Sequence, residues 1–400
     1  MGSVHEFIVN NWQYTIRKND KIPYPFTTPC ADDLFVHFFY WDTYFTNLGL
    51  LRDGLEEQAL NNLKVMAYFL NTLGYIPNAD DLLYRSQPPL FTRSIYDYVK
   101  YTGDESVIEQ FKKPMEIEFA FFKKNRLTPI GLYAYSSEEP KEGLDRYYQE
   151  FSRRLGGFNE EEKKLDKYVF ARGLLAIAES GWDFNVRFTS GNIRFAPYEF
   201  AHIDLNCLLY DAFNKASELF LMVGDKEEAD RLKEEANNLK DLINKYLLNP
   251  KDGLYYDYNF VKKEYSSILS AASFYPYALG ISDDKVGALK VFNVLNLKYG
   301  ISTAPFRGEA ATYFQWDYPA LWPSNSYFAF EALNNVGLNK YANIVRDKYL
   351  NIVNNVFKKT GKLWEKYDAS NGEVSITNEY QTPTMMGWTA GVYEYFLNKK

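Results

Sequence analysis

The sequence predicts an all-α protein, an (α/α)6 barrel that forms one domain over residues 1–400. About a dozen stretches space their apolar residues at helical intervals. Strands do not alternate with helices as they do in βαβ units. The loops between the helices differ greatly in length, and no fixed repeat or flexible linker divides the chain. We therefore expect a toroid of six inner and six outer helices, with its longer loops on one functional rim.

Glycines and prolines divide the chain into its expected helices. Gly74 ends one apolar helix, and Gly224-Asp225 joins two helices into a hairpin. Pro114 is expected to kink or split its helix. The charged stretch 144–164 suggests a lid-like or helical insertion, and 255–258 alternates like a short hairpin. The remaining helices are expected at Ser3–Lys18, in a run that ends at Leu51, and at Leu55–Leu73, Thr92–Tyr101, Asp104–Lys124, Tyr168–Ala178, His202–Met222, Lys226–Leu248, Ile268–Leu279, Asp283–Leu297, Asn325–Asn335, Asn339–Val356 and Met385–Leu397.

Charge and hydropathy exclude several classes of protein. The formal net charge is -7 and no basic run is present, so we expect neither a nucleic-acid partner nor a membrane-binding patch. No stretch is apolar enough to span a bilayer, and Met1–Trp12 lacks the apolar segment of a secretion signal. These features predict a cytoplasmic protein. The sequence does not fix its oligomeric state.

Cysteine and histidine are too sparse to predict a metal centre. The two cysteines form no disulfide framework or zinc pattern, and the three histidines do not cluster. We expect no metal and no organic cofactor, although a site built only from carboxylates stays open.

The stretch Glu179–Phe184 combines a turn, an indole and a carboxyl group. It follows the predicted helix 168–178, and Gly181 lets the chain turn sharply. Trp182 could exclude water from the carboxyl group of Asp183, and desolvation raises the pKa of a carboxyl group. A general acid that works near neutral pH needs such a shift. A helix cap followed by a core tryptophan and a solvated aspartate is the structural alternative.

Tryptophans gather at the breaks between helices, and three of the seven are followed directly by aspartate. A pyranose ring lays its C–H face on aromatic rings, while its hydroxyl groups bind carboxylates, amides and guanidinium groups. Each element has a structural alternative, such as a helix-capping acid, a surface ion pair of Arg85 or a solvated turn at Glu365-Lys366. Their joint occurrence along the whole chain favours a sugar-binding site. The three pairs are Trp41-Asp42, Trp182-Asp183 and Trp316-Asp317.

Six motifs between about residues 35 and 392 resemble, in order, those of inverting trehalases of glycoside hydrolase family 37. The Tyr-Trp-Asp and Gln-Trp-Asp elements are the most specific. The resemblance implies an (α/α)6 toroid with its active site on the loop-rich rim. The motifs are Phe39–Phe45, Gly74–Asn78, Arg85–Pro89, Glu179–Phe184, Gln315–Pro319 and Glu365–Tyr367.

The resemblance also implies roles for single residues. Asp183 would be the general acid and Glu365 the general base of an inverting α-glycoside hydrolase. Trp182, Gln315 and Trp316 complete the substrate-binding set that we expect. By the same matching, the sugar subsites would contain Trp41, Asp42, Asn78, Arg85, Gln87, Gly181 and Glu379.

Two departures from the family pattern leave the substrate open. Leu34 stands where the family has a sugar-binding arginine, and no Arg-Pro-Glu stretch follows 145–148. Arg153-Arg154 could replace the second arginine. Trehalose is the expected substrate. Mannosylglycerate, glucosylglycerate or another α-glucoside is the alternative, and a non-catalytic sugar-binding barrel or helical scaffold is a more remote one.

Overall fold

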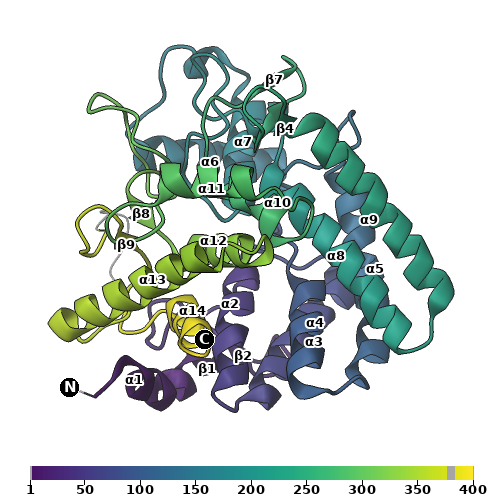
Figure 1. Ribbon diagram of the computed structural model, residues 1–400. Coiled ribbons are helices and arrows are strands. Elements are labelled where there is room, and N and C mark those ends of the chain that lie inside the picture. Colours follow the sequence, from purple (N-terminus) through teal and green to yellow (C-terminus); the bar gives the residue numbers. More distant parts are fainter. Residues whose placement is uncertain (1, 376–382, 400) are drawn as a thin grey trace.

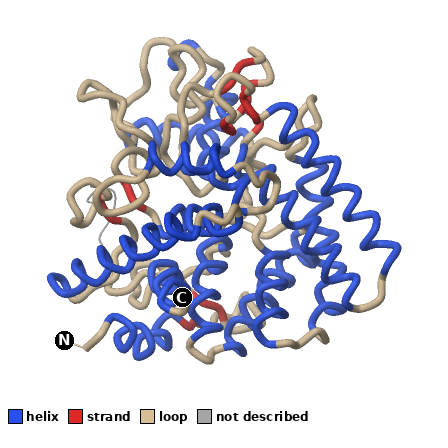
Figure 2. Tube along the Cα trace, viewed as in Figure 1, coloured by secondary structure: helices blue, strands red, loops and turns tan. Residues whose placement is uncertain are grey.

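The computed structural model describes residues 2–375 and 383–399. Within these residues, helices dominate and the strands are short pieces near the loops (Figures 1 and 2). No helix among them is long and apolar enough to cross a membrane. The α-helices are α1 Val4–Asn11, α2 Tyr40–Arg52, α3 Glu56–Leu73, α4 Phe91–Thr102, α5 Val107–Asn125, α6 Lys141–Arg154, α7 Lys167–Glu179, α8 Ile203–Met222, α9 Lys226–Tyr246, α10 Tyr275–Ala278, α11 Lys285–Leu295, α12 Pro323–Asn335, α13 Asn339–Thr360 and α14 Gly387–Leu397.

Six helices form a closed inner ring. In the order α2, α4, α8, α10, α12 and α14, each contacts the next, and α14 returns to α2. Helices α3, α5, α9, α11 and α13 pack outside this ring, and α1 lies against α13 and α14. The predicted (α/α)6 barrel is therefore confirmed. Helices α6 and α7 are additional to the ring and pack on each other.

The inner and outer helices differ in how they bury their side chains. The outer helix α9 buries one stripe that includes Leu232, Leu239 and Ile243, and its other faces are charged. This is the helical spacing that the sequence showed. The inner helix α8 is buried on nearly every face of its first ten residues, 203–212. Burial on all sides is expected for a helix that is surrounded by the rest of a barrel.

Glycine closes the ring at the junction of α14 and α2. A Cβ atom on Gly391 would lie 1.9 Å from the carbonyl oxygen of Phe45, so no other residue fits there without a shift of the backbone. The two chain ends also meet at this junction, because His5 of α1 lies 3.0 Å from both carboxylate oxygens of Glu394 in α14. The close contact of the first and last inner helices therefore depends on a missing side chain.

Three local predictions differ from the structure. Helix α5 runs without a break through Pro114. The carbonyl group that loses its partner there belongs to Gln110, which is exposed, so water can replace the lost bond. The stretch 268–279 forms only a 3₁₀ turn, Ala271–Phe274, and the short α10 that contains Pro276. The first predicted helix ends as α1 at Asn11, followed by a 3₁₀ turn.

Short strand pairs connect the loops near the barrel. The predicted hairpin near 255–258 exists as two neighbouring antiparallel pairs, β4 with β5 and β6 with β7. Strand β8 pairs with β9, which joins the loop before α12 to the loop before α14. The strands are β1 Ile16–Arg17, β2 Phe26–Thr27, β3 Phe200–Ala201, β4 Leu248–Asn249, β5 Leu254–Tyr255, β6 Tyr258–Asn259, β7 Glu264–Tyr265, β8 Ala320–Leu321 and β9 Tyr367–Asp368.

Candidate active site

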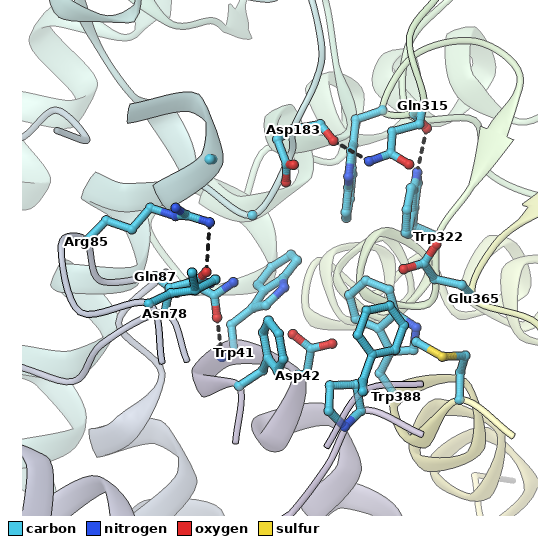
Figure 3. Close-up of a pocket in the computed structure, with 18 of the residues that line it drawn as sticks. Trp41, Asp42, Asn78, Arg85, Gln87, Asp183, Gln315, Trp322, Glu365 and Trp388 are labelled. Atoms are coloured by element: carbon cyan, nitrogen blue, oxygen red, sulfur yellow. Dashed lines mark hydrogen bonds between the residues drawn. The ribbon is translucent and has the colours of Figure 1, made fainter. Parts of the chain in front are cut away.

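A cavity of about 740 Å³ lies where α2, α12 and α14 begin and where the long loops converge. Its size is within the range of about 300–1,000 Å³ that is typical of ligand pockets. Ten of the twelve predicted site residues line it: Trp41, Asp42, Asn78, Arg85, Gln87, Gly181, Asp183, Gln315, Trp316 and Glu365. Figure 3 shows most of these side chains around one open space. Glu379 lies outside the described residues, and Trp182 is not among the lining residues.

The first turn of α2 supplies an indole and a carboxyl group to the cavity. Trp41 is buried, and its backbone N–H donates to the side-chain carbonyl of Gln87 at 3.0 Å. A Cβ atom on Gly181 would lie 2.9 Å from the Trp41 ring. Gly181 also has φ +75°, a conformation that strains other residues. Only glycine therefore lets the loop with Asp183 pass so close to this indole.

Asp42 shares the cavity with the carboxyl groups of Asp183, Glu365 and Glu150. Burial, together with the negative charges of Glu365 and Asp183, raises the pKa of Asp42 to about 7. A proton on Asp42 near neutral pH would relieve its repulsion with Glu365 and Asp183 and would give the site a hydrogen-bond donor.

The loop before α4 presents amide and guanidinium groups. The Arg85 guanidinium donates to the Asn78 side-chain oxygen at 2.8 Å and lies over the Tyr84 ring, with 4.9 Å to the ring centroid. This loop is anchored by Glu179, whose buried carboxylate accepts from the Ser86 backbone N–H at 2.8 Å and pairs with Arg126 at 2.7 Å. Because Glu179 ends α7, the anchor connects this loop to the turn that carries Asp183.

Asp183 lies in a polar setting. Its carboxylate pairs with the Arg154 guanidinium at 2.8 Å, and its side chain is 26% exposed. The sequence predicts that Trp182 shields this carboxyl group from water, but in the structure the indole lies elsewhere. Trp182 is fully buried and stacks on Trp316, with 5.3 Å between ring centroids and 16° between planes. An apolar wall formed by Trp182 therefore does not surround the Asp183 carboxyl group.

The Gln315 side chain connects the segments of Asp183 and Glu365. Its N–H donates to the Asp183 backbone carbonyl, and its oxygen accepts from the Lys366 ammonium at 3.0 Å. Lys366 also lies 3.2 Å from a carboxylate oxygen of Glu365. Figure 3 shows Gln315 between the two carboxyl groups, with Glu365 on the side of Trp322.

Stacked tryptophans form the rest of the wall. Trp316 and Trp322 stack at 3.8 Å with 3° between planes, and Trp388 packs edge-on against Trp322 at 5.5 Å. Trp322 and Trp388 are not among the site residues that the sequence predicts. The missing signal was their position at the start of the inner helices α12 and α14, where the cavity lies.

Helix α6 brings three charged residues to the cavity, Glu150, Arg153 and Arg154. The two arginines were the suggested replacements for a missing family arginine, and both line the cavity. A separate apolar cluster, which includes Phe151 of α6 and Phe170 of α7, holds this helix in place. Leu34, at the position of the other missing arginine, is 39% exposed and is not a lining residue.

Two groups of metal-ligating side chains lie away from this cavity among the described residues. One joins His5, Asp53 and Glu394, and the other joins His37, Asp80 and Asp81. None of these six residues lines the cavity. The cavity itself therefore offers carboxyl, amide, guanidinium and indole groups, the set that binds and cleaves sugars.

A comparison with known families decides the identity of the chain. A family model described as Trehalase matches residues 10–400. The chain belongs to the trehalase family. It is accordingly a glycoside hydrolase, as its motifs suggested.

Curated relatives of this trehalase-family chain include two animal enzymes. It is 28% identical to a trehalase from Tenebrio molitor over 403 residues, which covers 91% of this chain and 70% of the relative. It is 26% identical to a trehalase from Homo sapiens over 406 residues, with 94% and 67% coverage.

Solved structures share the fold. The neutral trehalase Nth1 from Saccharomyces cerevisiae superposes with a TM-score of 0.76 and 23% identity, over 99% of this chain and 80% of that one. A GH63 mannosylglycerate hydrolase from Thermus thermophilus, in complex with glucose, gives a TM-score of 0.70 and 16% identity over 99% and 100% of the two chains. At these identities the likeness supports the fold alone.

Proposed function

We propose that this chain is an α,α-trehalase that hydrolyses its substrate with inversion, with Asp183 as general acid and Glu365 as general base. The observation that carries the proposal is that both carboxyl groups line one cavity and come from different loops. Membership of the trehalase family and the two relatives named trehalase support the choice of substrate.

In the proposed reaction, one glucose unit binds beside Asp183 and Glu365. Asp183 gives its proton to the glycosidic oxygen as the bond to the anomeric carbon breaks. Glu365 takes a proton from a water molecule, and the water oxygen attacks the anomeric carbon from the opposite face. This geometry requires about 6.5–9.5 Å between the two carboxyl groups. Each proton transfer contributes roughly 10²–10⁴-fold to the rate.

Arg154 has a part in the proton-donor step. It holds the Oδ2 atom of Asp183 at 2.8 Å, so in the proposed step Oδ1 is the oxygen that would donate to the substrate. After the proton has left, the Arg154 guanidinium stabilises the carboxylate. Arg154 can therefore fix the direction in which Asp183 presents its proton to the substrate.

The other lining residues would bind the sugars. Trp41 offers a ring face for the C–H groups of a glucose unit. Asp42, with its pKa raised to about 7, and the amides of Asn78 and Gln87 can bind hydroxyl groups. The cavity also offers the guanidinium groups of Arg85 and Arg153, which supports binding without the arginine that Leu34 replaces.

A glycosylglycerate is the second candidate substrate. Arg153 and Arg154 at the cavity could pair with a carboxylate, and a mannosylglycerate hydrolase is among the structures that share the fold. Glu150 lies on the same helix as these arginines and opposes an anionic substrate there. We therefore favour the neutral disaccharide.

A substrate panel tests the proposal. Trehalose, kojibiose, mannosylglycerate and glucosylglycerate are offered separately to the purified chain, and released monosaccharide is measured. We expect the largest kcat/KM with trehalose. A larger value with either glycosylglycerate of the panel would overturn the trehalase assignment. Binding of all four compounds without turnover would support the non-catalytic alternative.

The cytoplasmic location is also part of this proposal. Its support is that the two cysteines, Cys30 and Cys207, are both buried and unpaired, as is usual for proteins of a reducing compartment.

A further inference from the structure

Lys366 is a buried cation directly behind the proposed base. Its side chain is 5% exposed, and its ammonium group lies 3.2 Å from the Glu365 carboxylate and 3.0 Å from the Gln315 side-chain oxygen. The ammonium group also lies over the Trp322 ring, with 4.9 Å to the ring centroid. A lysine this deeply buried needs compensating partners, and each of these three supplies negative charge or electron density.

The Gln315 amide can adopt only one orientation here. Lys366 has no hydrogen-bond acceptor, so it must face the amide oxygen. The Asp183 backbone carbonyl has no donor, so it must face the amide nitrogen. The two partners therefore determine the direction of the side chain without any ambiguity between its oxygen and its nitrogen.

The backbone of the same segment strengthens this connection. The Trp322 indole N–H donates to the Gln315 backbone carbonyl at 3.0 Å, and the Trp316 backbone N–H donates to the Phe184 carbonyl at 3.1 Å. The strand pair β8–β9 joins the other end of this segment to the chain that follows Lys366. The segment 315–322 thus contacts the chain on both sides of the reaction site.

We propose that Lys366 and Gln315 are positioning residues that act together as one brace between the two catalytic carboxyl groups. Lys366 fixes the position of the Glu365 carboxylate and sets a positive charge beside it, and Gln315 holds that pair at a set distance from the Asp183 backbone. The inference rests on the proposed function of Asp183 and Glu365. Its consequence is that Gln315, expected to bind substrate, serves mainly to set the gap in which the attacking water must fit.

The charges around Glu365 explain why the brace matters. Asp42 of α2 repels the Glu365 carboxylate, and Asp183 lies across the same cavity. Arg154 is engaged with Asp183. Lys366 places its positive charge 3.2 Å from the Glu365 carboxylate. The other charged groups that line the cavity are Arg85, Glu150 and Arg153.

A pH profile tests the electrostatic half of the proposal. Lys366→Met removes the charge but keeps an unbranched side chain, and Lys358→Met changes an exposed lysine of α13 as the control. With trehalose as substrate, we expect the acidic limb of kcat/KM for Lys366→Met to move up by about one pH unit. We expect Lys366→Met to lose about tenfold in kcat at the wild-type pH optimum. Lys366→Arg, which keeps the positive charge, should leave the acidic limb of kcat/KM where it is in wild type.

A double-mutant cycle tests whether the two residues act together. Gln315→Met removes both side-chain hydrogen bonds at similar length, and we expect about a tenfold fall in kcat with little change in KM. If the pair is one brace, the Lys366→Met/Gln315→Met double variant loses little more than the worse single variant. Fold-losses that simply multiply would show independent residues and would overturn the brace.

Separate outcomes distinguish this inference from the proposed function. If folded Lys366→Met keeps the wild-type acidic limb of kcat/KM while Glu365→Gln is inactive, the brace is overturned. The assignment of Glu365 as the base then still stands. If Glu365→Gln keeps wild-type turnover, Glu365 is not the base, and the proposed brace is overturned as well. Circular dichroism and thermal unfolding of each variant, compared with Lys358→Met, show whether a loss of activity comes from misfolding.

Discussion

The segments Trp182-Asp183 and Trp316-Asp317 have the same dipeptide sequence, but their aspartates lie in different places. Their indoles stack on each other, at 5.3 Å between ring centroids. Asp183 nevertheless lines the cavity and pairs with Arg154, whereas Asp317 is buried away from it. Asp317 accepts from the Phe314 backbone N–H at 3.1 Å and pairs with Arg307 at 3.1 Å. One acid is available to a substrate, and the other holds a loop closed.

The difference teaches that a local motif identifies a chemical group without giving its direction. Gly181, with φ +75°, turns the chain so that Asp183 enters the cavity while Trp182 points into the core. In the other segment Trp316 lines the cavity, and Asp317 turns back to its own loop. The roles of indole and acid are therefore exchanged between the two segments.

The largest expected effect separates the two aspartates by activity. Asp183→Asn should lower kcat by at least about 100-fold, because an amide cannot donate an acidic proton to the leaving oxygen. Glu365→Gln should lower kcat by a similar factor, because an amide cannot accept a proton from water. Asp317→Asn should stay within a few-fold of wild type, since Asp317 does not line the cavity. Steady-state kinetics on trehalose measure all three. Near-normal turnover by Asp183→Asn would remove its role as proton donor.

A smaller effect is expected at the arginine that partners Asp183. Arg154→Gln should lower kcat/KM about 10- to 100-fold, because a charge-assisted hydrogen bond to a carboxylate is worth about 1.5–3 kcal/mol. Arg146→Gln on the same helix is the matched control, since Arg146 is exposed and does not line the cavity. Equal losses in the two variants would mean that the pairing with Asp183 has no special role.

A third effect concerns the pH dependence of stability. Burial raises the pKa of Asp317 from 3.8 to about 7, and Arg307 opposes this shift. As pH rises from about 4 to 7, the unfolded chain loses this proton before the folded chain does, so wild type loses free energy of unfolding. Asparagine does not titrate. Asp317→Asn should therefore gain about 3 kcal/mol relative to wild type between these limits.

Urea unfolding of wild type and Asp317→Asn at acidic and alkaline pH measures this difference. Asp283→Asn, which changes an exposed aspartate, is the control and should follow wild type at both pH values. A constant difference between Asp317→Asn and wild type would contradict the raised pKa of Asp317.

The smallest effect is expected at the partner of Asp317. Arg307→Gln should lower the free energy of unfolding by about 1 kcal/mol, because this guanidinium is partly exposed and solvent screens its ion pair. The loss should be larger above pH 7, where Asp317 is charged. Thermal unfolding measures the loss of stability in Arg307→Gln, and activity assays measure its kcat. A fall in kcat comparable to that of Arg154→Gln would contradict a purely structural role for Arg307.

Much of the barrel could be predicted, because helix formation depends on local spacing. Long outer helices such as α9 were found with their buried stripe. Predictions failed at two prolines. Helix α5 continues through Pro114, where the exposed Gln110 carbonyl can bind water, and 268–279, which contains Pro276, is mostly turn. The number of helices and the unequal loops predicted the ring, but its closure by Gly391 against Phe45 joins residues far apart in sequence and could not be predicted.

The candidate site was predicted in composition but only partly in geometry. Short motifs placed Asp42, Asp183 and Glu365 together because each stands in a loop or first turn at the same rim. The direction of Trp182 could not be predicted, since it depends on stacking with a residue more than a hundred positions away. The contacts of Gln315 with both catalytic segments were likewise invisible in the sequence.

Proton NMR of trehalose hydrolysis tests the central claim most directly. If Asp183 and Glu365 act from opposite faces of one glycosidic bond, the attacked glucose unit is released as the β anomer and the departing unit as the α anomer. We therefore expect equal amounts of α- and β-glucose before mutarotation equilibrates them. The initial appearance of α-glucose alone would show retention and would contradict the proposed roles of both residues.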